Sequence, residues 1–140
     1  MLGLFKAAKA VRQVKILIVD DDTSVRETLR DRLVRQGWDV AAVCDGHQAL
    51  AAAAENKPDV VLLDIHMPQM DGLTALECFR RDPDLSDVPV MMVTGSSQVS
   101  DISRAASCNV ADYVTKPFNA TDLVTRVEQV LRRTQRSTTL

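Results

Sequence analysis

The stretch from Lys15 to Asp22 reads KILIVDDD, a short run of mainly apolar residues followed directly by three aspartates. Apolar runs of this length are typical of strands that are covered on both faces, as in a parallel sheet. Further runs of this kind occupy residues 60–63, 88–93 and 113–115, with a weaker one at 38–43. Segments with helical spacing separate them, so strand and helix alternate five times. This alternation predicts an α/β fold in which helices cover both faces of a parallel sheet.

Capping signals and apolar spacing place the helices between these strands. Ser24 and Glu27 have the spacing of a capping box, and Gly37 stands where the end of that helix is expected. Asn119 is the expected N-cap of the last helix, whose apolar residues recur at positions 123, 127, 130 and 131. The other expected helices span residues 49–54, 73–79 and 99–106. Together they supply the crossovers that join parallel strands.

The composition indicates one ordinary globular domain. The chain has 140 residues, of which 46% are apolar and 26% charged, and its formal net charge is −2. No run approaches the roughly 18 apolar residues of a membrane span, and the N-terminus lacks the apolar core of a secretion signal, so we predict a cytoplasmic protein. Without a basic block, nucleic acid is not expected as a direct partner. The three cysteines lack metal-site spacing and are expected to be buried free thiols.

Three segments are expected along the chain. Residues 14–133 carry the alternating strand and helix pattern, and residues 134–140 are expected to form a C-terminal tail. Residues 1–13 interleave apolar and basic side chains, as a short cationic amphipathic helix does. A frayed or packed N-terminal extension is the favoured interpretation of this segment, and docking to a membrane surface or to a partner protein is the alternative.

Polar side chains follow four of the apolar runs, at the points where the strands end. They are Asp20, Asp21, Asp64, Thr94 and Lys116. In an open α/β sheet, ligands bind beyond the carboxyl ends of the strands. Two carboxylates about 4 Å apart repel by about 4 kcal/mol at an effective dielectric near 20, so a cluster of three requires a cation. Oxygen ligands alone favour Mg²⁺.

The same residues suit the transfer of a phosphoryl group. A carboxylate can attack phosphorus and form an acyl phosphate, while a metal ion and a lysine neutralise the phosphoryl oxygens. Asp64 is the expected nucleophile because it stands alone at its strand end, whereas Asp20 and Asp21 are adjacent and available to hold metal. Each residue by itself is an ordinary turn or cap residue. Suitable residues at the same end of four strands favour a functional site.

Four motifs, in order along the chain, resemble those of the receiver domains of response regulators in two-component signalling. They are KILIVDDD at 15–22, LLDIHMPQMDG at 62–72, VTG at 93–95 and DYVTKPF at 112–118. The resemblance covers residues 14–133. It implies a flavodoxin-like, doubly wound sheet of five parallel strands in the order 2-1-3-4-5.

The resemblance also implies a role for each residue of the acidic site. Asp64 would be the phosphoryl acceptor, and Lys116 would contact the phosphoryl group. Asp20, Asp21 and Asp64 would bind Mg²⁺ together with the backbone carbonyl of His66. The imidazole of His66 is expected at the solvated rim of the site rather than on the metal.

A second group of residues would form the switch. By similarity, Thr94 would move its hydroxyl to the phosphoryl group and Tyr113 would turn into the space it leaves. The peptide bond between Lys116 and Pro117 is expected to be cis. His66 and Ser96 stand two residues after the acceptor and the switch hydroxyl, where members of this family tune the lifetime of the phosphoryl group. The candidate apolar residues of the face to be remodelled are Val99, Ile102, Tyr113, Val124 and Val127, several of which must belong to the core.

These expectations define a phosphorylation-dependent signalling switch. The phosphoryl donor would be a sensor histidine kinase or a histidine phosphotransfer protein, and the target would be a protein that binds the altered surface. The chain would catalyse only its own phosphorylation and dephosphorylation, and would be a monomer or a phosphorylation-promoted dimer. It would be either a stand-alone regulator or a fragment of a longer protein.

Two alternatives belong to other functional classes. Asp20 and Asp22 match the D-x-D nucleophile motif of haloacid-dehalogenase-type phosphohydrolases, with Thr94 and Lys116 as candidate later motifs. That interpretation leaves Asp64 without a role and the chain without room for a cap domain. The second alternative is a phosphorylation-independent module that binds a second messenger or a partner at a basic surface. Its candidate residues are Arg132, Arg133 and Arg136.

Overall fold

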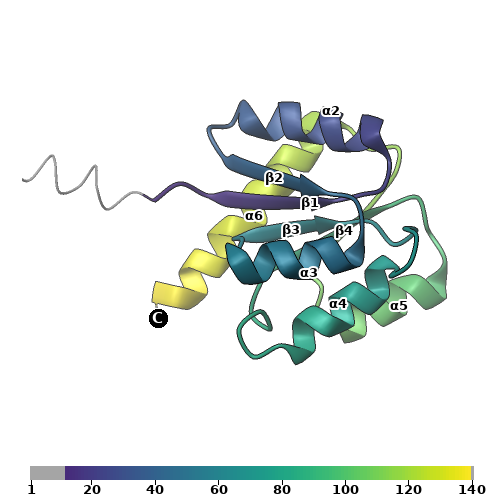
Figure 1. Ribbon diagram of the computed structural model, residues 1–140. Helices are drawn as coiled ribbons and strands as arrows, with labels where there is room; N and C mark the ends of the chain where they lie inside the picture. Colours follow the sequence, from purple (N-terminus) through teal and green to yellow (C-terminus); the bar gives the residue numbers. More distant parts are fainter. Residues whose placement is uncertain (1–11, 140) are drawn as a thin grey trace, which may run out of the picture.

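The structure, a computed structural model, describes residues 12–139 and shows a parallel sheet between two layers of helices (Figure 1). The sheet has five strands in the order β2-β1-β3-β4-β5. The strands are β1 (Lys15–Val19), β2 (Asp39–Val43), β3 (Val60–Leu63), β4 (Val90–Thr94) and β5 (Asp112–Thr115). The helices are α2 (Thr23–Val34), α3 (Gly46–Glu55), α4 (Gly72–Arg81), α5 (Val99–Ser107) and α6 (Ala120–Thr139). The predicted fold class and strand order are confirmed.

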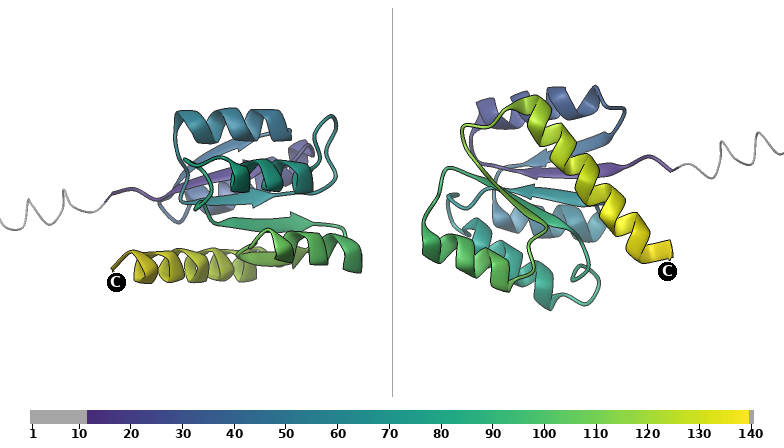
Figure 2. Two further views of the ribbon diagram at one scale, coloured as in Figure 1. Left: turned by 90° about the horizontal axis from the view of Figure 1, so that it is seen from below. Right: turned by 180° about the vertical axis from the view of Figure 1, so that it is seen from behind.

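Alternate residues of each strand face opposite helix layers. On β1, Ile16 and Ile18 pack with α2 and α6, whereas Leu17 and Val19 pack with α3, α4 and α5. Figure 2 shows α6 crossing one face of the sheet, beside α2. Because both faces are covered, the strands have apolar side chains at nearly every position. This explains why the strands appear in the sequence as continuous apolar runs.

Local hydrogen bonds set several element ends differently from the sequence prediction. The capping box at Ser24 is wrong, because α2 begins at Thr23 and its N-cap is Asp22, whose side chain accepts from the Val25 N–H at 3.2 Å. The strand expected from Val88 begins only at Val90. Val88 donates its N–H to a turn carbonyl, and Pro89 has no N–H to donate.

The last helix is longer than the sequence predicted. Helix α6 continues to Thr139, through residues that we expected to form a separate tail. The Asn119 cap is confirmed, since its side chain accepts from the Asp122 N–H at 3.1 Å. The extension expected over residues 1–13 lies outside the described residues up to position 11. Among the helices of residues 12–139, none has both the length and the apolar character needed to span a bilayer.

The cysteines are more accessible than expected. Cys44, Cys78 and Cys108 are free thiols, as predicted, but each is half-buried rather than buried. Cys108 lies at the end of α5 and Cys44 directly after β2, at element ends rather than in the middle of the core.

The end of β3 depends on a close backbone approach at Gly72. The N–H of Gly72 donates to the Ile65 carbonyl at 2.8 Å, which folds the loop after β3 back onto the strand end. A Cβ atom at this position would collide with the backbone carbonyl of Asp64. Glycine is required here because only a residue without a side chain lets the two backbone segments meet.

We expect Gly72→Ala to lower the free energy of unfolding by about 1–3 kcal/mol, because the added methyl group forces the backbone at Asp64 to shift. Gly95→Ala is the matched control, since no described atom lies within 4 Å of a Cβ there, and its effect should stay below about 1 kcal/mol. Urea denaturation measures both. Equal stability of the two variants would contradict the close approach.

Candidate functional site

Parallel pairing brings the ends of β1 and β3 together. Val19 lies beside Leu63 in the register of the two strands, and the Asp64 N–H donates to the Val19 carbonyl at 3.0 Å. The residues that follow the two strands are therefore neighbours, although they are far apart in the sequence. Asp20 is only 2% exposed and Asp64 only 6% exposed. Burying two carboxylates at one edge of a sheet is costly unless a positive charge or hydrogen bonds replace the lost water.

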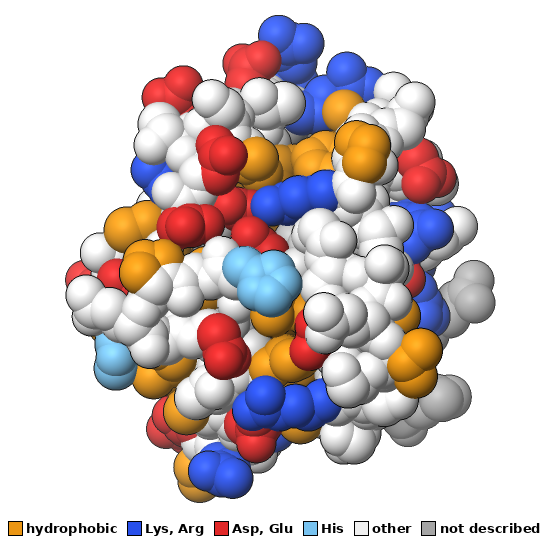
Figure 3. Space-filling model, turned by 90° about the vertical axis from the view of Figure 1, so that its right-hand side faces the viewer, with side chains coloured by type: hydrophobic (Ala, Val, Ile, Leu, Met, Phe, Trp, Pro, Cys, Tyr) orange, Lys and Arg blue, Asp and Glu red, His pale blue; other side chains and the backbone are white. Residues whose placement is uncertain are grey.

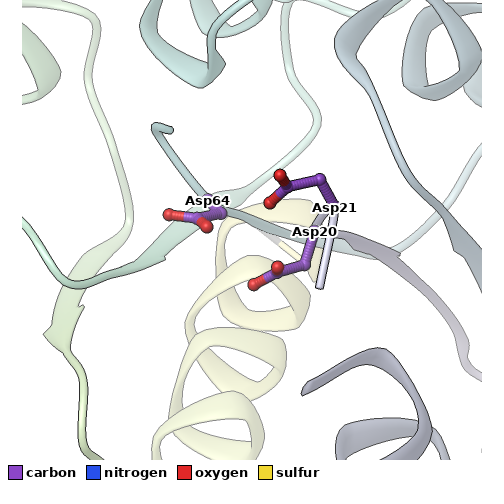
Figure 4. A group of neighbouring side chains, drawn as sticks. All are labelled: Asp20, Asp21 and Asp64. Atoms are coloured by element: carbon purple, nitrogen blue, oxygen red, sulfur yellow. The ribbon is translucent and has the colours of Figure 1, made fainter. Parts of the chain in front are cut away.

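Three carboxylates meet at this edge. One oxygen from each of Asp20, Asp21 and Asp64 lies within 4.8 Å of the others. Figure 4 shows the side chains of Asp20 and Asp21, from the end of β1, beside that of Asp64 from the end of β3. Asp21 is exposed, so the cluster opens to solvent. The space-filling view of this edge shows acidic side chains gathered next to basic ones and a histidine (Figure 3).

Lys116 places a positive charge between the two buried aspartates. Its Nζ lies 2.6 Å from Asp20 Oδ2 and 3.1 Å from Asp64 Oδ2. The lysine follows β5, and its backbone N–H donates to the Thr94 carbonyl at 2.8 Å, which holds the start of this loop beside the end of β4. The cis peptide bond predicted between Lys116 and Pro117 is present.

Backbone N–H groups satisfy the other carboxylate oxygens. Asp20 Oδ1 accepts from the Asp22 N–H at 2.9 Å, and Asp64 Oδ1 accepts from the Ile65 N–H at 2.7 Å. These bonds orient each carboxylate through a backbone N–H of the loop that directly follows its own strand. Asp22 itself caps α2 instead of joining the cluster, which removes the second aspartate of the D-x-D motif from the site.

The pKa shifts show that one lysine does not balance the site. Burial is the largest influence on Asp20 and raises its pKa, against hydrogen bonds from Lys116 and the Asp22 backbone that lower it. For Lys116, burial lowers the pKa, but the hydrogen bond with Asp20 and the charges of both buried aspartates outweigh it, so the net shift is upward. The upward shift at Lys116 follows from its two acidic partners, whereas the upward shift at Asp20 follows mainly from burial. Three clustered carboxylates against one lysine leave the site with net negative charge, which favours a further cation.

The donor set fits a hard divalent cation. All three clustered groups are carboxylates, and one of them is open to water, as suits an ion that keeps part of its hydration shell. His66 is exposed at this edge, as predicted for a solvated rim imidazole. The part assigned to its backbone carbonyl stays a prediction.

The switch residues lie beside the acidic cluster. Thr94 at the end of β4 is fully buried, and its Oγ1 accepts from the Ser96 N–H at 3.3 Å. The hydroxyl of Tyr113 on β5 donates to the Ser96 carbonyl at 2.8 Å. Burial raises the pKa of Tyr113, and its hydrogen bond with Ser96 only partly opposes this effect, so the phenol stays protonated and available as a donor. Ser96 thus contacts both switch residues.

The apolar residues expected on the output face divide into two groups. Val99 and Ile102 on α5 are exposed, at 78% and 40%. Val124 and Val127 on α6 are buried in the core, in line with the expectation that several of the five residues are core residues. The sequence could not tell which ones, because helical spacing gives a stripe but not which stripe meets the sheet.

One contributor was missed by the sequence analysis. Asp101 on α5 accepts from the Ser96 hydroxyl at 2.5 Å. An acidic residue in the first turn of a helix is common for reasons of helix stability alone, so its position in the sequence did not single it out.

Fold and site together define the class of this protein: a flavodoxin-like domain with a carboxylate cluster and a lysine at the carboxyl edge of its sheet. The model of one family, the response regulator receiver domain, matches residues 16–128. The chain belongs to this family.

Curated relatives agree with this assignment. The chain is 37% identical over 122 residues to the "DNA-binding dual master transcriptional regulator RpaA" of Synechocystis sp. (strain ATCC 27184 / PCC 6803 / Kazusa), covering 87% of this chain and 51% of the relative. It is 41% identical over 121 residues to the "DNA-binding response regulator MtrA" of Mycolicibacterium smegmatis (strain ATCC 700084 / mc(2)155), covering 86% and 52%. The chain thus spans about half the length of these relatives.

Solved structures share the fold over nearly their whole length. A putative response regulator from Chloroflexus aurantiacus J-10-fl is 32% identical, with a TM-score of 0.81 over 86% of this chain and 99% of that one. The chemotaxis response regulator CheY4 of Vibrio cholerae is 28% identical, with a TM-score of 0.79 over 85% and 99%. The sequence-based recognition of the family is confirmed, and it displaces the phosphohydrolase alternative.

We expect Asp20→Asn to raise the free energy of unfolding by roughly 1 kcal/mol at neutral pH in excess chelator, because it removes a buried charge that Lys116 only partly balances. Because the pKa of Asp20 is raised above its usual value of 3.8 in the folded protein, ionisation of this carboxyl lowers the free energy of unfolding as the pH rises from 3.8 past the raised pKa. The gain should therefore disappear in acid. Denaturation curves at both pH values test this.

Asp39→Asn, at the exposed start of β2, is the matched control and should change stability by less than about 0.5 kcal/mol. If the Asp20→Asn protein in excess chelator is less stable than the unsubstituted protein at neutral pH, the pairing of Asp20 with Lys116 outweighs the cost of burying its charge.

Proposed function

We propose that this chain is a phosphorylation-dependent signalling switch whose acceptor is Asp64. The observation that carries the proposal is the position of this carboxylate: it is buried among two further aspartates and a lysine, with Lys116 Nζ 3.1 Å from its Oδ2. Membership of the response regulator receiver family supports the same role.

The acceptor's own contacts suit it to attack phosphorus. The Ile65 N–H and Lys116 hold the two oxygens of Asp64 in a fixed orientation. A carboxylate oxygen forms a bond to phosphorus as the bond from phosphorus to the donor breaks, and the donor leaves with that electron pair. Lys116 then lies where it neutralises charge on the transferred phosphoryl oxygens.

Mg²⁺ is the proposed cofactor. Asp20, Asp21 and Asp64 would hold it through their carboxylates, together with the backbone carbonyl of His66. When bound, the ion supplies positive charge to the phosphoryl oxygens during transfer. This role accounts for three carboxylates facing a single lysine.

The transferred group changes the charge of the pocket by about −1.5 to −2. We propose that the hydroxyl of Thr94 moves to the phosphoryl group and that Tyr113 turns into the vacated space. Because Tyr113 donates to the carbonyl of Ser96 in the loop before α5, its movement alters the surface around Val99 and Ile102. That surface, formed by α5 and β5, is the proposed output face.

The proposed phosphoryl donor is a sensor histidine kinase or a histidine phosphotransfer protein, and the proposed target is another protein. RpaA and MtrA are named as DNA-binding regulators, but they are about twice as long as this chain. In our proposal the residues described here receive the phosphoryl group and make no direct contact with DNA. The chain catalyses only its own phosphorylation and dephosphorylation.

We expect incubation with acetyl phosphate and Mg²⁺ to produce an acid-stable, base-labile adduct of one phosphoryl group. Asp64→Asn should abolish the adduct because an amide is too weak a nucleophile, whereas the control Asp39→Asn, remote from the cluster, should retain it. Intact-protein mass spectrometry measures both. An undiminished adduct in the Asp64→Asn protein would place the acceptor elsewhere.

Neighbouring aspartates provide a sharp test of the metal site. Asp21→Asn should weaken Mg²⁺ binding at least tenfold in titration calorimetry, because it removes one of the three clustered carboxylates. Asp22→Asn is the control, because asparagine also caps a helix and Asp22 lies outside the cluster. Equal losses in the two variants would mean that general negative charge, rather than a defined site, attracts the ion.

A further inference from the structure

Arg26 on α2 holds the loop that carries two of the clustered carboxylates. Its backbone N–H donates to the carbonyl of the N-cap residue Asp22 at 3.0 Å, within the first turn of the helix. Its side chain reaches back toward β1, where Nη1 donates to the Asp20 carbonyl at 2.8 Å and Nη2 donates to Thr23 Oγ1 at 3.1 Å. One half-buried guanidinium therefore joins the end of β1 to the start of α2.

The Asp20 carbonyl lies between two of the clustered residues. It belongs to the planar peptide unit that joins Asp20 to Asp21, so its direction constrains the backbone torsions on both sides, ψ of Asp20 and φ of Asp21. Those torsions set how the two side chains point relative to each other. Both residues contribute an oxygen to the carboxylate cluster. The hydrogen bond from Arg26 to this carbonyl thus constrains two of the three carboxylates at once.

Asp21 depends on this constraint more than Asp20 does. The Asp20 carboxylate is also held directly, by Lys116 and by the Asp22 N–H. Asp21 is exposed, and within residues 12–139 no hydrogen bond or ion pair fixes its carboxylate. The position of the Asp21 carboxylate in the cluster therefore follows from the backbone that carries it.

We propose that Arg26 is a positioning residue for the Mg²⁺ site: it sets the peptide between Asp20 and Asp21 so that both carboxylates face one ion. This inference rests on the proposed function, in which these carboxylates bind Mg²⁺. Arg26 itself donates to a backbone carbonyl and a hydroxyl, and acts on the ion only through the residues it orients. Loss of a group that orients metal ligands commonly weakens metal binding tenfold or more.

The sign of the effect separates positioning from charge. A guanidinium beside a cation site repels the ion, so Coulomb's law alone predicts that removing the charge of Arg26 strengthens Mg²⁺ binding. Loss of positioning predicts the opposite, because carboxylates that are free to adopt several arrangements must be ordered when the ion binds. Weaker Mg²⁺ binding by a protein that has lost a positive charge next to the site would therefore identify the positioning role.

Three variants of the full chain test this inference by titration calorimetry with Mg²⁺. Arg26→Met keeps an unbranched apolar stem, removes both side-chain hydrogen bonds and should raise the dissociation constant about tenfold. Arg26→Lys keeps the charge and one donor group but not the fork that spans two acceptors, so it should recover part of the loss.

Arg30→Met is the matched control. It removes the same charge one turn further along α2, from an exposed side chain that donates to the Val40 carbonyl at 3.4 Å. Its dissociation constant for Mg²⁺ should change by less than about twofold, because charges in water are screened. Urea denaturation in excess chelator establishes that each variant is folded.

A second measurement follows the site through its chemistry. The Mg²⁺ concentration that gives half the maximal rate of labelling by acetyl phosphate should rise in Arg26→Met by the same factor as the dissociation constant. Agreement of the two factors would show that the effect of Arg26 on labelling is exerted through the metal site.

Weaker Mg²⁺ binding in Arg26→Met, partial recovery in Arg26→Lys and near-normal binding in Arg30→Met support the proposal. Tighter or unchanged binding in Arg26→Met, an equal loss in Arg30→Met, or an Arg26→Met protein that does not fold overturns it. Failure of the proposed function is distinguishable. It appears as an unsubstituted chain that takes up no Mg²⁺, or as one that binds Mg²⁺ with the expected ranking of variants and yet accepts no phosphoryl group at Asp64.

Discussion

The contact of Lys116 with Asp20 and Asp64 is the interaction on which the rest of the site depends. It links the ends of β1, β3 and β5, which come from distant parts of the chain. Without it, two buried carboxylates would face each other with no positive charge between them. The lysine does not fully offset the cost of burying Asp20, whose pKa remains raised by burial. Three clustered carboxylates against one lysine also leave net negative charge, which makes the pocket receptive to a divalent cation and to the chemistry we propose.

The fold supplies this arrangement through general features of parallel sheets and a few exact local ones. Parallel strands end at the same edge, so residues that follow β1, β3 and β5 meet there. Gly72 lets the loop after β3 fold back onto Asp64, and backbone N–H groups orient both buried carboxylates. From this edge, Ser96 carries the connection outward to α5. Lys116 connects the acceptor Asp64 to the end of β4, and hydrogen bonds of Ser96 connect Thr94 to α5.

Sequence reasoning was accurate where a pattern repeats along the chain and less accurate where a single local bond decides. The apolar runs predicted all five strands, but the last apolar stretch before Thr94 was predicted to start at Val88, because apolar character cannot show that Pro89 has no N–H to donate. Ser24 was predicted as the cap of α2, but the turn after β1 places Asp22 at the N-cap, where its side chain accepts from the Val25 N–H. Val99 and Val127 were both candidates for the output face, and the sequence could not show that Val99 is exposed and Val127 buried.

The amino-acid sequence by itself determined the alternation of strands and helices, the identity of the carboxylates and lysine at the strand ends, and through its four motifs the receiver family. These properties are local, since each depends on residues that are close neighbours along the chain. The tertiary structure alone decided that Lys116 bridges Asp20 and Asp64, that Asp22 is excluded from the cluster, and that Asp101 holds Ser96 beside Tyr113. Such contacts depend on distances between separate elements, and those distances follow only from how the whole sheet and its helices pack.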